Sequence, residues 1–197
     1  MQKNIVAAFL VVVTSFTAAP ARSADNCAAV LKSMNAEVAQ KAYRIRSTDQ
    51  NPDSGKVTSS NVAEVQPPDR MHLINGADET IVIRGKGTFR KSNNGGWEKA
   101  PYDLSDAMLS FYDRKNFEKF SKDCKRITTE KLDGHPMSVW QFRSESPGIV
   151  SISKIWISDS DGLPYKMEID GEVAKHKTRT VQLIQYDPKI SIQAPIR

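Results

Sequence analysis

The chain has 197 residues, a formal net charge of +5 and 39% hydrophobic residues. This length is enough for one domain with its own core, and no low-complexity linker or compositional break divides it. The net positive charge is low, and the basic residues are not interleaved with exposed aromatic residues. Both features argue against a nucleic-acid partner.

Residues 1–24 predict a cleaved signal peptide. Lys3 supplies a positive start, and residues 5–13 form an unbroken apolar run that is too short to anchor the chain in a bilayer. Residues 19–21 then fit the small-x-small rule for cleavage. We therefore expect an exported, periplasmic protein whose mature chain, residues 25–197, forms a single domain.

The chain has two cysteines, Cys27 and Cys124. In an exported protein this number indicates one disulfide, which would close a loop of about 98 residues. Two separate buried thiols are the alternative. Neither cysteine is part of a Cys-x-x-Cys motif, so the pattern does not indicate redox catalysis.

Asn-Gly and Asp-Gly turn signals, such as Asn75-Gly76 and Asp133-Gly134, divide the chain into strand-length pieces of alternating polarity. Helical periodicity occurs only in residues 25–40 and 104–119. We expect the tail, residues 187–197, to be a surface loop. The predicted strands are 41–48, 56–66, 70–75, 79–84, 87–92, 127–132, 138–144, 151–158, 163–169 and 178–186.

This order predicts an α+β fold with a single curved antiparallel sheet. The sheet forms an unclosed β-barrel, or half-barrel, covered by about two helices. Two short helices supply little apolar surface to cover so large a sheet. Either large side chains of the sheet fill the interior, or the interior keeps a cavity for an apolar ligand; the residues alone leave both interpretations open.

The residues expected to line such a cavity are large, apolar and alternate along their strands, which predicts that they share one face. Methionine and aromatic side chains also suit an irregular ligand. The candidate ligand-binding residues are Met71, Leu73, Ile81, Ile83, Trp140, Phe142, Tyr165 and Met167.

Catalytic and metal-binding signals are weak. His72, His135 and His176 lie far apart, and none has a second histidine at metal-ligand spacing. Asp159 and Asp161 are typical of a turn, with calcium binding as the less favoured alternative. No Gly-x-Ser-x-Gly motif is present. We therefore expect no cofactor, no metal and no enzymatic activity.

A basic cluster lies on and after the second predicted helix. It is either a solvated helix face or a weak docking site for an anionic membrane surface or an acidic partner. Its members are Arg114-Lys115, Lys119, Lys122 and Lys125-Arg126.

The chain resembles the periplasmic lipoprotein carrier family, which is LolA-like and includes the mycobacterial LppX-type lipid-binding lipoproteins. The resemblance follows the order of elements and covers the mature chain. The segments that carry it are Val65-Gln66-Pro67-Pro68-Asp69-Arg70-Met71-His72-Leu73, Gly96-Trp97, Asp161-Gly162-Leu163-Pro164 and Gln185-Tyr186-Asp187, followed by Ile190 and Pro195.

The resemblance implies an unclosed barrel wrapped over helices, with an apolar interior that holds acyl chains and no catalytic machinery. The partner would then be a lipid or an acylated protein, and the chain would be a periplasmic carrier. One position departs from the family, which has a basic residue just before the proline where this chain has Gln66. The alternative is therefore an envelope regulatory or sensor module that binds a protein partner.

Overall fold

The computed structural model describes residues 27–91, 95–109, 118–119, 121–146, 149–173 and 176–196. The predicted signal peptide and most of the second half of the predicted helix 104–119 lie outside these residues.

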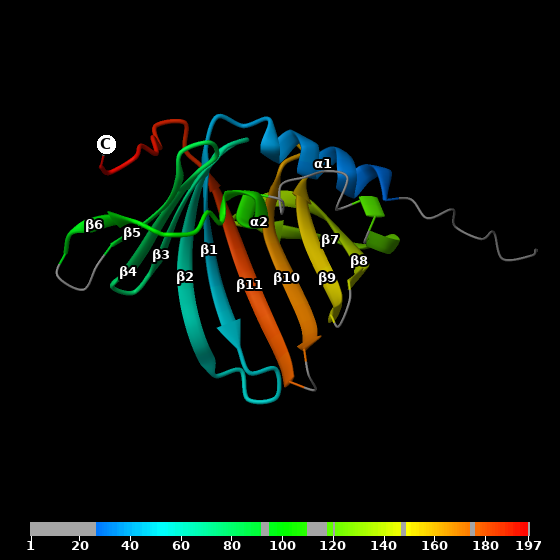
Figure 1. Cartoon of the computed structure of the whole chain (residues 1–197). Coiled ribbons are helices and arrows are strands. Elements are labelled where there is room, and N and C mark those ends of the chain that lie inside the picture. Colours follow the sequence, from blue (N-terminus) through cyan, green and yellow to red (C-terminus); the bar gives the residue numbers. More distant parts are fainter. Residues whose placement is uncertain are drawn as a thin grey trace, which may run out of the picture.

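One antiparallel sheet of eleven strands dominates the fold (Figure 1), in the order β6-β5-β4-β3-β2-β1-β11-β10-β9-β8-β7. Because β6 and β7 form its two edges, the sheet is open, and the predicted half-barrel with its helices is confirmed. The strands are β1 (Tyr43–Gln50), β2 (Val57–Gln66), β3 (Arg70–Asn75), β4 (Asp78–Ile83), β5 (Gly87–Lys91), β6 (Trp97–Lys99), β7 (Ser121–Leu132), β8 (His135–Ser146), β9 (Ile149–Ser158), β10 (Pro164–Val173) and β11 (His176–Tyr186).

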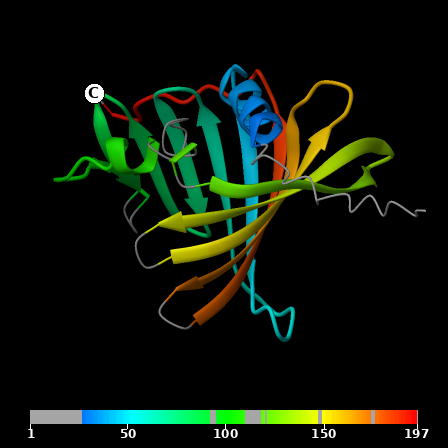
Figure 2. The same cartoon turned by 90° about the vertical axis from the view of Figure 1, so that its right-hand side faces the viewer.

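Within the part of the chain that the structure describes, two helices with defined bounds lie on the concave side of the sheet (Figure 2). The first is α1 (Ala28–Val38), which contacts β9 and β10, and the second is α2 (Ser105–Leu109), which contacts β4. Among the described residues, these helices therefore cover only part of the inner face of the half-barrel.

Helix α1 forms where apolar residues recur at four-residue steps, and it matches the prediction within a few residues at each end. Val30 is fully buried and packs with Phe142 and Ile155 on the concave face. Cys27, immediately before the helix, forms a disulfide with Cys124 of β7. The predicted disulfide is confirmed, and it ties the start of α1 to the edge of the sheet.

Helix α2 covers only the start of the helix predicted over 104–119, whose residues 110–117 lie outside the described part of the chain. Two hydrogen bonds fix its start. The amide of Ser105 donates to Oδ1 of Asp103 at 2.8 Å, as expected for a capping aspartate. The amide of Leu104 donates to Oγ1 of the buried Thr88 at 2.9 Å, which ties the helix to β5.

The C-terminal tail is a loop, but it is not confined to the surface as the sequence suggested. Ile190 and Ile192 are buried against Ile81, Ile83 and Phe89. The tail therefore covers an apolar patch on the outer face of β4 and β5.

Polar contacts hold the tail in place. Arg70 Nη1 donates to the carbonyl of Ile192 at 2.7 Å, and the amide of Ile192 donates to Oε1 of Gln66 at 3.1 Å. Gln66, the position that departs from the carrier family, therefore binds the chain's own C-terminal segment.

Candidate functional site

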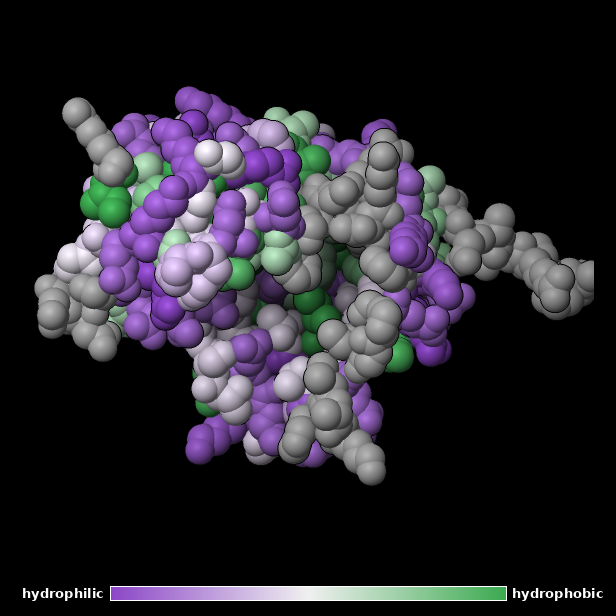
Figure 3. All heavy atoms as spheres, in the orientation of Figure 1, coloured by the Kyte–Doolittle hydropathy of each residue, from purple (hydrophilic) through white to green (hydrophobic). Residues whose placement is uncertain are grey.

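A cavity of about 460 Å³ lies between α1, α2 and the concave face of the sheet. This volume falls within the range of roughly 300–1,000 Å³ that is usual for small-molecule sites. Figure 3 shows hydrophobic atoms inside a hollow near the centre of this side of the molecule. The apolar lining of the 460 Å³ cavity consists of Leu31, Met34, Val38, Ile45, Ala63, Met71, Leu73, Met108, Met167, Ile169 and Ile184.

The strand register brings the apolar wall together. Ile45 of β1 lies opposite both Ala63 of β2 and Ile184 of β11, and Ala63 lies opposite Leu73 of β3. Directly opposed residues of antiparallel strands point to the same face. Four strands therefore contribute one continuous apolar row to the cavity.

The cavity persists because the middle of this row is small. Ala63 is buried, yet its methyl group fills far less space than the isoleucine and leucine side chains beside it. Four flexible methionines, Met34, Met71, Met108 and Met167, line the walls and can repack around differently shaped guests.

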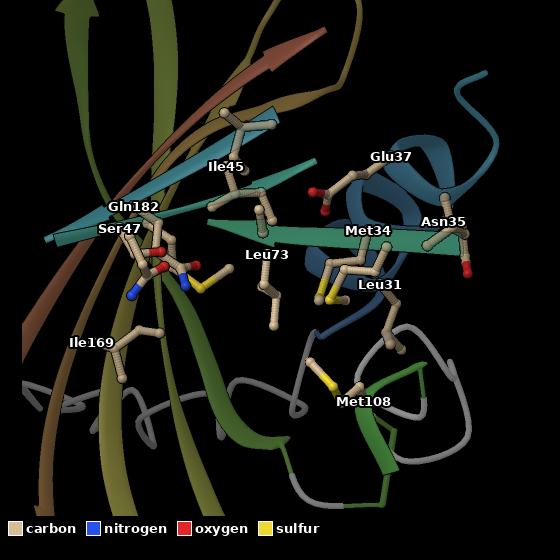
Figure 4. Close-up of a pocket in the computed structure, with 16 residues that line it drawn as sticks. Leu31, Met34, Asn35, Glu37, Ile45, Ser47, Leu73, Met108, Ile169 and Gln182 are labelled. Carbon is tan, nitrogen blue, oxygen red and sulfur yellow. The ribbon is translucent and has the colours of Figure 1, made fainter. Parts of the chain in front are cut away.

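Glu37 of α1 places a buried carboxyl in this apolar setting. The residue is 6% exposed, and no described residue pairs with its side chain through a hydrogen bond or salt bridge. Figure 4 shows the carboxyl pointing from α1 toward the cavity, near Ile45 and Leu73. Desolvation raises the pKa of Glu37 from 4.5 to about 8, so the group is mostly protonated at neutral pH.

Tyr186 lies close enough to Glu37 for the two side chains to interact electrostatically. The Tyr186 hydroxyl donates to the carbonyl of Pro164 at 2.6 Å, and its ring packs against Tyr43 and Tyr165. Burial, with a smaller contribution from Glu37, raises the pKa of Tyr186. The Glu37 carboxyl and the Tyr186 hydroxyl are therefore both mostly neutral near pH 7.

A second polar group lies along the sheet from Glu37. Ser47 of β1 lies directly opposite Asn61 of β2 and Gln182 of β11, so these three side chains form a row across three strands. Figure 4 shows Ser47 and Gln182 side by side, with Ile45 and Leu73 between them and Glu37. We call Ser47, Asn61 and Gln182 the polar row.

Three of the eight predicted ligand-binding residues line the cavity: Met71, Leu73 and Met167. Trp140 and Phe142 share the concave face, where they pack beneath α1 with Val30 rather than against the cavity. These five residues lie on one face, as the alternation predicted.

Ile81 and Ile83 do not share that face. Arg70 pairs with Ile83, and Met71 pairs with Val82, so the hairpin turns the two isoleucines outward. They are buried there under the C-terminal tail. The shared-face expectation was wrong for these residues because an apolar residue under the tail alternates in the same way as one facing a cavity.

Tyr165 also lies away from the cavity. It packs against the cluster of Met137, Val139 and Trp156. Its hydroxyl donates to Oδ2 of Asp161 at 2.9 Å, and a register shift at Pro164–Lys166 interrupts the alternation just there. The same Asp161 accepts the amide of Leu163, which identifies it as a turn-forming residue.

Sequence reasoning missed part of the cavity, including Glu37 and the polar row. The apolar stripe of α1 was available as a signal, and it correctly placed the helix on the sheet. Glu37, in contrast, belongs to a segment of ordinary helical polarity, so only the packed structure shows that it is buried.

Among the described residues, no group of three or more His, Cys, Asp or Glu side chains is arranged to hold a metal ion. His72 lies on the outer face, with Nε2 3.0 Å from Glu79 and Nδ1 3.5 Å from Glu64. None of the helices in the described part of the chain is long and apolar enough to span a membrane.

Comparison with solved structures places the fold. LprF from Mycobacterium bovis has a TM-score of 0.62 at 13% identity, with 87% of this chain and 98% of that chain covered. The lipoprotein LppX of Mycobacterium tuberculosis has a TM-score of 0.59 at 14% identity, with 84% and 96% covered. The LppX-type half-barrel fold predicted from the sequence is confirmed. No protein-family model and no curated protein matches the chain.

Proposed function

We propose that this protein is an exported, non-enzymatic binding protein that holds lipid or lipoprotein acyl chains in the cavity between α1, α2 and the sheet. The observation that carries the proposal is the cavity of about 460 Å³ with a largely apolar lining. Its fold is that of LppX and LprF, which supports a binding role.

The energetics favour an acyl guest. Each methylene transferred from water contributes about 0.8 kcal/mol, so a long chain gains on the order of 10 kcal/mol before ordering costs. In this proposal the acyl chain contacts Met71, Leu73 and Met167. Trp140 and Phe142 support α1 beside the cavity.

The disulfide supports the predicted export. Disulfides persist in oxidising compartments such as the bacterial periplasm, and Cys27 and Cys124 are joined here. We propose a periplasmic location, with transient contact to a membrane surface when the guest is loaded or released.

A cavity-filling substitution tests the proposal. Ala63→Phe places a large side chain in the middle of the apolar wall, so we expect it to abolish uptake of the neutral fluorescent dye Nile red. Val62→Phe is the matched control, because Val62 is the neighbouring residue on β2 and faces the other side.

The wild type and Val62→Phe should bind the dye, and Ala63→Phe should not. Circular dichroism would establish that both variants are folded. Dye uptake by folded Ala63→Phe equal to that of the wild type would contradict the proposal, as would a wild type that takes up neither dye nor lipid.

A second candidate function is binding of an envelope protein partner at the edge of the sheet. Strand β7 is long and largely exposed, with Ile127 40% exposed, and within the described chain it pairs only with β8. An extended peptide can add to such an edge through backbone hydrogen bonds. This candidate predicts a stable complex whose affinity does not change when Ala63→Phe fills the cavity.

A further inference from the structure

The cavity carries information about the polar end of its guest. Among the described residues that line it, five are polar, and none is lysine, arginine or histidine: Asn35, Glu37, Ser47, Asn61 and Gln182. A charged group moved from water into apolar surroundings is costly unless an opposite charge meets it. The described lining therefore offers hydrogen bonds but no cation to an anionic headgroup.

The polar row has free hydrogen-bonding capacity. The side chains of Ser47, Asn61 and Gln182 make no hydrogen bond to any other described residue, and Ser47 is 8% exposed. An amide side chain offers two donors and an acceptor oxygen, and a hydroxyl offers one donor with acceptor capacity. A guest with hydroxyl or amide groups would satisfy these atoms where a plain hydrocarbon leaves them unpaired.

Asp49 places a carboxylate next to the polar row, one inward-facing position further along β1. Asp49 follows Ser47 by two residues on β1, so it lies on the same face. Its Oδ1 accepts the Thr180 hydroxyl at 2.6 Å and its Oδ2 accepts the Ser59 hydroxyl at 2.5 Å. Glu37 lies at the other end of the apolar wall. Acidic residues therefore flank the polar row and the wall on both sides, and an anionic headgroup would meet neutral or acidic partners.

We propose that the polar row selects an uncharged acyl lipid whose headgroup carries hydroxyl or amide groups, in preference to an anionic lipid with the same acyl chain. The acyl chain of this lipid lies along Ile45, Ala63 and Leu73. Its headgroup forms hydrogen bonds with Ser47, Asn61 and Gln182. This inference rests on the proposed acyl-binding function and names the class of lipid that the function serves.

Competition between two lipids of equal chain length tests the inference. Monolauroylglycerol and laurate would each be titrated against Nile red bound to the mature wild-type chain near pH 7. We expect monolauroylglycerol to displace the dye with an affinity at least about tenfold higher than that of laurate. Equal affinities, or tighter binding of laurate, would overturn the inference while leaving the acyl-binding function intact.

A charge introduced into the polar row gives the second arm. Gln182→Lys supplies the missing cation, so laurate should gain about tenfold in affinity and the preference should shrink or reverse. Gln185→Lys is the matched control, because this residue lies on the outer face of the same strand. It should keep the wild-type preference. A preference that stays unchanged in Gln182→Lys, in a variant that still binds Nile red, would overturn the role of the polar row.

The dye separates the two failures. If the wild type binds neither Nile red nor either lipid, the acyl-binding function itself fails and this inference falls with it. If the dye binds and the lipids do not differ, only the headgroup preference is wrong.

Discussion

Cys27 and Cys124 lie 97 positions apart in sequence, yet their Cα atoms are 4.9 Å apart and a disulfide joins them. The bond connects the residue before α1 to the edge strand β7. On the concave face of the sheet, Val30 holds α1 in place by packing with Phe142 and Ile155. The disulfide therefore fixes one end of α1, the helix that covers one side of the cavity.

Removal of this disulfide should lower stability markedly. In the loop-entropy model a cross-link that closes a loop of about 100 residues contributes roughly 4–5 kcal/mol, which is an upper figure for the double variant Cys27→Ser, Cys124→Ser. Thermal unfolding monitored by circular dichroism should show a lower midpoint than in the wild type. Wild-type protein in reductant should approach the variant, and equal midpoints in all three samples would contradict the prediction.

Glu37→Gln should stabilise the protein, and by more at alkaline than at acidic pH. The Glu37 carboxyl has a pKa of about 8 in the fold against an ordinary value of 4.5, so the folded state keeps a proton that the unfolded chain loses. Wild-type stability therefore falls as pH rises from about 4.5 to about 8, and the deficit is constant above that range. Glutamine cannot ionise and escapes this penalty, which is on the order of a few kcal/mol.

Chemical denaturation near pH 5 and near pH 9 measures this difference. The stability gain of Glu37→Gln should be small at the lower pH and large at the higher. Glu172→Gln changes an exposed glutamate on β10 and is the control. A gain that is the same at both pH values would mean that burial of Glu37 does not govern its ionisation.

Leu73→Asp should abolish acyl uptake. Leu73 lines the cavity and contacts the core cluster of Tyr43 and Val65, so a carboxylate there would be charged in apolar surroundings. Ile74→Asp is its control, since it alters the next residue of β3, which faces the other side. Nile red titration should show loss of binding for the first variant and retention for the second, provided that circular dichroism shows both to be folded.

Glu79→Gln should weaken the outer face of the sheet, mainly near neutral pH. Glu79 accepts a hydrogen bond from Lys91 Nζ at 2.5 Å and lies 3.0 Å from His72 Nε2. The Lys91 contact, with His72, lowers the pKa of Glu79, so its stabilisation is present above the ordinary pKa and is lost as pH falls through the lowered one.

The size of this effect is modest because solvent still screens this partly exposed pair, and we expect a loss of less than about 1 kcal/mol. Urea unfolding near pH 7 should show the loss, and the difference from the wild type should disappear in strong acid. A difference that persists unchanged below the lowered pKa would indicate a packing defect rather than a lost charge interaction.

The sequence by itself determined the elements and the class of fold. Asp-Gly and Asn-Gly turns close hairpins through local backbone preferences, and period-two alternation marks strands wherever it occurs. Both signals act within a few residues, so the meander, helix α1 and the candidate lining residues Met71, Leu73 and Met167 were predictable. The cysteine count favoured one disulfide, and the structure confirmed it.

Only the tertiary structure decided which apolar face is hollow and which is filled. Ile81 and Leu73 alternate alike, but Ile81 is covered by Ile190 and Ile192, which arrive from the far end of the chain. The burial of Glu37 and the alignment of Ser47, Asn61 and Gln182 likewise depend on partners distant in sequence. Alternating polarity along a strand indicates that one of its faces is apolar, but not whether a cavity or another segment of the protein lies against that face. Polarity is a property of each residue, whereas burial depends on the assembled chain.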